Sequence, residues 1–131
     1  MNRAFVSLIV ITGLMAVAEG PVAAHHSYSA FEMQQDKTIA GTVKKFDWTN
    51  PHTWLWIDVP NEQGAADTWG IEGMSPNYLA RRGWTKSTLK FGDKITVVIH
   101  PLRDGSHGGS FQRVTLPNGQ TMSMTGQPTE P

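Results

Sequence analysis

The sequence predicts a small, mainly β domain of the OB-fold type, which is a five-stranded barrel with one short helix between its third and fourth strands. Two observations predict this class. Three segments in which apolar and polar residues alternate come before a short helical segment, and two more such segments follow it. The order of elements does not prove that the strands close into a barrel, so a small β-sandwich with one helix is the alternative.

Alternation predicts the first three strands over residues 38–48, 53–59 and 67–73. The turn between the first two contains Asn50 and Pro51, residue types that favour turns. The second strand carries apolar bulk on both faces, because Leu55 and Ile57 alternate with Trp54 and Trp56. One of these sets is expected in the core, and the other needs a cover or a ligand.

The helix is predicted over residues 75–82, where Ser75 can be the N-cap, Pro76 begins the first turn and Gly83 ends the helix. Two more strands are expected over 94–100 and 110–116, joined by a polar loop over 102–109, and residues 120–124 can pair back as a hairpin. The aliphatic sides of the strands predict one shared core that contains Leu55, Ile57, Ile95, Val97, Ile99 and Val114.

The first 24 residues have the pattern of a secretory signal peptide. Arg3 precedes an uncharged apolar run over residues 4–18, Gly20 and Pro21 break the run, and small residues up to Ala24 suit cleavage after that position. The run is shorter than the roughly 20 apolar residues that cross a bilayer. The sequence therefore predicts an exported, periplasmic protein without a membrane span after cleavage, with one β domain over 25–124 and a disordered tail over 125–131.

Composition excludes several functional classes. Eleven basic and eleven acidic residues leave no basic excess, so we expect no nucleic-acid binding. The chain has no cysteine, which excludes a disulfide, a thiolate metal site and a thiol nucleophile. It also lacks the GxSxG, P-loop and GxGxxG motifs. These observations favour a binding domain without a catalytic apparatus of its own.

The histidines are the candidate metal ligands, because imidazole is the commonest metal ligand in proteins. Four of them lie at the new amino terminus, in a turn or at a strand end, and form the predicted site: His25, His26, His52 and His100. An amino-terminal amine together with imidazoles suits copper better than zinc. The alternative is that the first two are a solvated terminus and that the other two form hydrogen bonds within turns. An enzyme built on such a copper site is a further alternative, with no substrate pocket visible in the sequence.

Trp54 and Trp56 form the second candidate site, a face for a ligand or a partner, since OB-folds use such a face for binding. The alternative is that the polar segment before the first strand covers them with Tyr28 and Phe31. The predicted partners are a small ligand, a metal ion or an envelope protein. An interaction module that docks a protein through the aromatic face is the main alternative to metal binding.

Several short motifs along the whole predicted mature chain resemble those of a known protein family. They are His25-His26-Ser27, Trp48-Thr49-Asn50-Pro51-His52, Ser75-Pro76-Asn77, Arg82-Gly83-Trp84, Gly92-Asp93 and His100-Pro101-Leu102-Arg103-Asp104-Gly105. Together they resemble a family of small exported proteobacterial proteins that is classed as a domain of unknown function. The resemblance implies an exported setting and brings no assigned activity or site.

Overall fold

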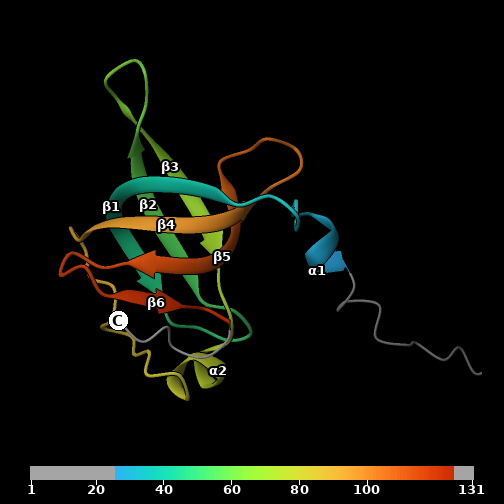
Figure 1. The fold of residues 1–131 in the computed structure, drawn as a ribbon, viewed down its shortest axis with the longest axis vertical. Coiled ribbons are helices and arrows are strands. Elements are labelled where there is room, and N and C mark those ends of the chain that lie inside the picture. The colour runs from blue at the N-terminus through green and yellow to red at the C-terminus, as the bar shows by residue number, and fades with distance from the viewer. Residues whose placement is uncertain (1–25, 126–131) are drawn as a thin grey trace, which may run out of the picture.

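The computed structural model describes residues 26–125, and the predicted signal peptide and residues 126–131 lie outside this range. The elements are α1 (His26–Ser29), β1 (Lys37–Asp47), β2 (Trp54–Pro60), β3 (Ala66–Glu72), α2 (Pro76–Ala80), β4 (Lys94–Pro101), β5 (Gly108–Thr115) and β6 (Thr121–Ser123) (Figure 1). From β1 onward they follow each other in the predicted order. Within the described residues, no helix is long and apolar enough to span a membrane.

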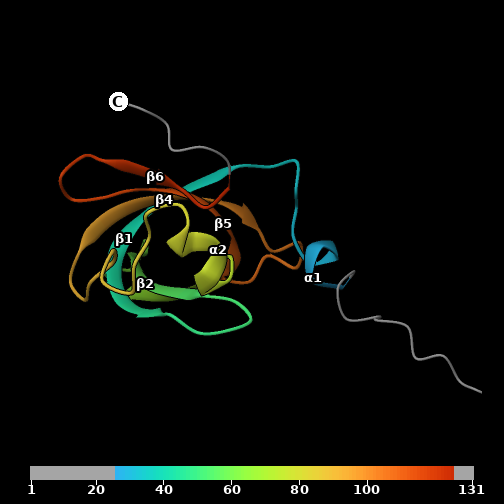
Figure 2. The same ribbon diagram turned by 90° about the horizontal axis from the view of Figure 1, so that it is seen from below.

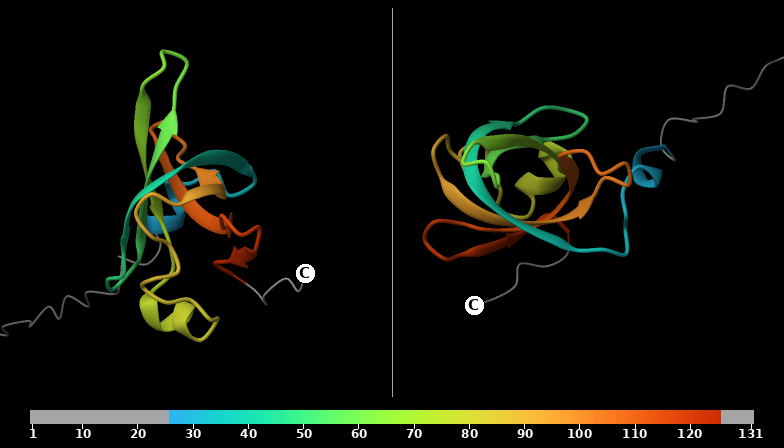
Figure 3. Two further views of the ribbon diagram at one scale, coloured as in Figure 1. Left: turned by 90° about the vertical axis from the view of Figure 1, so that its left-hand side faces the viewer. Right: turned by 90° about the horizontal axis from the view of Figure 1, so that it is seen from above.

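The first five strands close into a barrel. Antiparallel pairing joins β3 to β2, β2 to β1, β1 to β4 and β4 to β5, and a parallel pairing between β3 and β5 closes the circle. Seen from above, these strands form a ring (Figure 3). β6 pairs only with β5 and continues the sheet beside the ring. The predicted OB-fold-like barrel is therefore confirmed, and the closure excludes the alternative of an open two-sheet sandwich.

The core lies inside the ring, where the alternating strands point their aliphatic sides. All six predicted core residues are at most 4 % exposed: Leu55, Ile57, Ile95, Val97, Ile99 and Val114. Trp69 and Ile71 of β3 join the same cluster. Burial of these side chains is the main source of stability, because no disulfide is available.

The short helix α2 covers one end of the barrel, as the view from below shows (Figure 2). Ser75 is its N-cap, with the side-chain oxygen accepting from the Tyr78 amide, and Pro76 stands in the first turn as predicted. Leu79 of the helix and Trp84, just after it, are buried in the barrel core. The helix has the position and the N-cap that were predicted, but it ends at Ala80 and not at residue 82.

The segment before β1 contains two features that were not predicted. Residues 26–29 form the one-turn helix α1, and Phe31 forms an isolated β-bridge with Leu102 in the loop after β4. Arg103 strengthens this contact, since its amide donates to the Ala30 carbonyl and its Nε donates to the Phe31 carbonyl. The segment is therefore attached to the 102–107 loop.

Candidate functional site

Two tryptophans lie side by side on the outer face of β2. Leu55 and Ile57 point into the core, so the alternation of the strand turns Trp54 and Trp56 outward. The two indole rings are nearly parallel, with an angle of 19° and a centroid separation of 5.8 Å. Both side chains are half-buried. They form a stacked aromatic pair on the outside of the barrel.

Gly70 of β3 makes room for this pair. It pairs with Trp56 across the two strands, and a Cβ atom at this position would lie 2.7 Å from Cζ3 of the Trp56 ring. The ring therefore packs directly over the β3 backbone, an approach that only glycine permits. A glycine inside a strand often marks such a close contact, so Gly70 is the sequence signal from which this packing could have been predicted.

Asp47 holds the Trp56 ring from the β1 side. Its carboxylate accepts a hydrogen bond from Trp56 Nε1 at 3.1 Å and lies 2.7 Å from Lys45 Nζ. The hydrogen bond from Lys45 is the main reason that the pKa of Asp47 is below its ordinary value, and the Trp56 bond acts in the same direction. The ionised form of Asp47 is thus favoured in the folded protein.

The lowered pKa predicts how Asp47→Asn will behave with pH. The folded state favours the carboxylate, so its contribution is present above the pKa of the unfolded chain and is lost as the pH falls through the lower, folded value. At neutral pH we expect Asp47→Asn to cost less than about 1 kcal/mol, since the carboxylate is partly exposed. Urea midpoints measured between about pH 7 and pH 2 should converge for the two proteins as the pH falls. A difference that stays constant with pH would contradict this assignment.

Lysine, carboxylate and imidazole side chains surround the two tryptophans, and they lie in pairs. Lys45 pairs with Asp47, Lys44 lies 3.6 Å from Asp58, and His52 contacts Glu72. Glu72 is the cross-strand neighbour of Trp54. Asp58 and Glu72, on neighbouring strands, therefore have different partners, Lys44 and His52.

Of the predicted metal ligands, the structure describes the side chains of His52 and His100, and these two contact different partners. Nδ1 of His100 is 3.0 Å from the Gln35 carbonyl oxygen and 3.4 Å from the Asp36 carboxylate, whereas His52 contacts Glu72. His100 on β4 pairs with Ser110 on β5, and Ser110 pairs with Glu72 on β3. The backbones at His100 and Glu72 are therefore two strand spacings apart, about 10 Å.

The amino-terminal part of the predicted metal site is not described. His25 and the side chain of His26 lie outside the described residues. In the described part of the chain, no three His, Asp or Glu side chains are grouped so that they could hold a metal ion. The four-histidine site remains a prediction of the sequence.

The segment before β1 packs against the 102–107 loop and not against the tryptophan pair. Phe31 is buried against that loop, and Tyr28 is 59 % exposed. In the same loop, the ring of His107 stacks on Trp69 at a centroid distance of 4.9 Å. The expectation that Tyr28 and Phe31 would cover Trp54 and Trp56 is therefore replaced by a contact with this loop.

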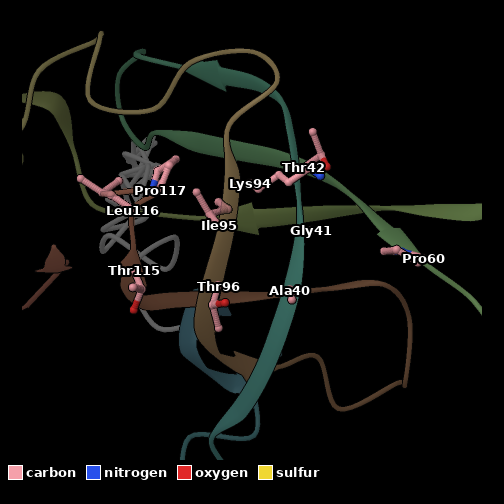
Figure 4. A pocket seen from close by; sticks show the side chains of 10 residues that line it. All are labelled: Ala40, Gly41, Thr42, Pro60, Lys94, Ile95, Thr96, Thr115, Leu116 and Pro117. Carbon is pink, nitrogen blue, oxygen red and sulfur yellow. The ribbon is translucent and has the colours of Figure 1, made fainter. Parts of the chain in front are cut away.

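A groove of about 510 Å³ is lined by residues of β1 and β4, the ends of β2 and β5, and the turn after β5 (Figure 4). Small side chains of β1 and β4 form much of its lining, with Thr42 and Thr96 among them, and Pro60 at the end of β2 also contributes. Thr42 pairs with Asp58, which stands two residues after Trp56 on the same side of β2. The groove thus adjoins the carboxyl end of β2, the strand that carries the tryptophans.

Of the comparisons with known proteins, the one with protein families gives a match. Residues 13–115 match the model of a family described as a family of unknown function (DUF6152). No curated protein and no solved structure matches the chain. The match covers more than half of the sequence and agrees with the resemblance to a domain of unknown function that the short motifs indicate. The chain belongs to this family of unknown function, DUF6152.

Proposed function

We propose that the protein is an exported, non-catalytic binding domain whose ligand site is the outer face of β2 and β3. One observation carries this proposal: the half-buried, nearly parallel pair of Trp54 and Trp56, which packs over Gly70. In OB-folds the surface of the second and third strands is the usual binding face. Large aromatic side chains on such a face supply apolar contact area at a small cost in side-chain entropy.

The contacts that hold the Trp56 ring support a binding role. Trp56 is fixed on one side by the hydrogen bond to Asp47 and beneath by the contact with Gly70. A ring that is held before binding loses little further freedom when a ligand arrives, which favours affinity. Glu72 and His52 at the edge of the pair add polar groups that can orient a ligand.

Cosedimentation with the envelope fraction of the producing cells tests this role and does not require the ligand to be identified. We expect the processed protein to sediment with the envelope, and Trp54→Ala and Trp56→Ala to reduce the bound fraction by about tenfold or more. Phe91→Ala is the matched control, since this aromatic side chain is 85 % exposed and lies outside the face. Equal sedimentation of all four proteins would contradict the proposal.

We propose a copper role only in a restricted form, in which the amino-terminal residues His25 and His26 carry it. His52 and His100 are each held by other partners. Titration with Cu(II) should therefore give the same stoichiometry and affinity for His52→Ala and His100→Ala as for the unchanged processed protein, whereas His25→Ala should weaken binding. A loss of affinity for Cu(II) in all three variants would contradict this restricted form and support the single four-histidine site.

A further inference from the structure

We infer that the ligand of the Trp54 and Trp56 face is a neutral, linear glycan with flat pyranose rings. This inference rests on the proposed function and names the ligand class of the same site. It follows from three features of the face: an aromatic pair, a rim of paired charges, and an adjoining groove with small hydroxyl side chains.

The aromatic pair fits the apolar side of a sugar ring. A pyranose whose substituents are equatorial presents C–H groups on a flat face and hydroxyl groups around its edge. A flat indole ring suits this side of the sugar, and two of them stand on the outer face of β2, stacked and nearly parallel, with Trp56 packed over the β3 backbone at Gly70. Such stacking buries apolar area on both sides while the sugar edge stays free for hydrogen bonds.

The rim selects against charged ligands. Three pairs surround the aromatic surface, and each one joins a cationic or imidazole group to a carboxylate: Lys44 with Asp58, Lys45 with Asp47, and His52 with Glu72. An anionic or cationic ligand would have to compete with one partner of each pair, whereas a hydroxyl group can donate to a carboxylate and accept from a lysine. A nucleic acid is disfavoured further, because the chain carries no net charge.

The groove continues the face beyond Asp58. Thr42, Thr96 and Thr115 line it with hydroxyl groups, and Lys94 is its one charged lining residue among those described. From Trp56 to Pro60 the path along β2 covers four residues, or about 13 Å, which is a length that several linked sugar rings can span. A linear oligosaccharide therefore fits this surface better than a single sugar does.

A series of linear hexasaccharides that differ in charge tests the inference. The probes are chitohexaose, which is neutral, its fully deacetylated and cationic form, and a hyaluronan hexasaccharide, which is anionic. Isothermal titration of the processed protein should show binding of chitohexaose, with an affinity that does not change between low and high salt. Trp54→Ala and Trp56→Ala should weaken this binding by about tenfold or more, and Phe91→Ala should leave it unchanged.

The outcomes separate this inference from the proposed function. If no neutral oligosaccharide binds, but the tryptophan variants still lose envelope binding, the face is a binding site and its ligand is not a neutral glycan. Stronger binding of the cationic or anionic probe, with an affinity that falls at high salt, would likewise overturn the ligand class. If chitohexaose binds equally to the tryptophan variants and the unchanged protein, the glycan binds elsewhere, and the inference that it is the ligand of this face is wrong. Thermal unfolding of each variant, unchanged from the parent protein, verifies that lost binding is not lost folding.

Discussion

Trp84→Ala is expected to remove about 3 to 5 kcal/mol from the free energy of unfolding, the range measured for large aromatic residues deleted from a core. The side chain is 2 % exposed and packs against Phe111, with a ring-centroid distance of 5.9 Å and a near-perpendicular angle of 79°. Its Nε1 donates a hydrogen bond to the Ser123 carbonyl at 3.1 Å, which ties the end of the barrel to β6. Deletion would leave a cavity and an unpaired carbonyl group.

Urea unfolding measures this loss, since a lower midpoint with an unchanged slope reports a change in stability. Trp84→Phe keeps most of the volume and should cost less than Trp84→Ala. Phe91→Ala, at an 85 % exposed position, should stay within about 0.5 kcal/mol of the unchanged protein. A loss below about 1 kcal/mol in Trp84→Ala would show that this side chain is not part of the barrel core.

Ile57→Ala should cost about 2 to 5 kcal/mol, because its side chain is completely buried in the core. Ile57 pairs with Val43 of β1 and Trp69 of β3, so it lies between the strands on both sides of β2. Ile57→Val removes a single methylene and should cost only about 0.5 to 1.5 kcal/mol. A loss below about 0.5 kcal/mol in Ile57→Ala, which is typical of surface positions, would place the core on the other face of β2.

The fold could be predicted because its signals are local and agree with one another. Alternation in β2, β4 and β5 identified the buried face correctly at every predicted core position, from Leu55 to Val114. Ser75 and Gly83 placed the helix between the third and fourth strands. Closure of the barrel was not predictable in the same way, because it depends on contacts between strands that are distant in the sequence.

Gly108 and Gly109 show why closure could not be predicted. The sequence places them in a loop, since glycine favours turns, but in the structure they begin β5 and pair with β3. A Cβ atom at Gly108 would lie 2.8 Å from the Gly70 carbonyl oxygen. The two strands approach so closely here that glycine is needed for steric reasons, which residue type alone does not reveal.

The candidate face was predicted in part. The alternation of β2 correctly turned Trp54 and Trp56 away from the core. The partners that hold Trp56 were not predicted, because it is the register of β2 against β1 and β3 that brings Asp47 and Gly70 to it. The pairing of His52 with Glu72 depends on the same register. Side-chain partners across strands follow from the register, which the sequence of one strand does not define.

An NMR titration that follows the indole N–H signals of the five tryptophans while chitohexaose is added tests the proposed binding face at the residues that form it. We expect saturable shifts of the Trp54 and Trp56 signals, each assigned by a Trp→Phe variant. The Trp84 signal should not move, because its N–H is bonded to the Ser123 carbonyl inside the core. Saturable shifts confined to the other tryptophans, with those of Trp54 and Trp56 unchanged, would contradict the claim that the outer face of β2 and β3 is the binding site.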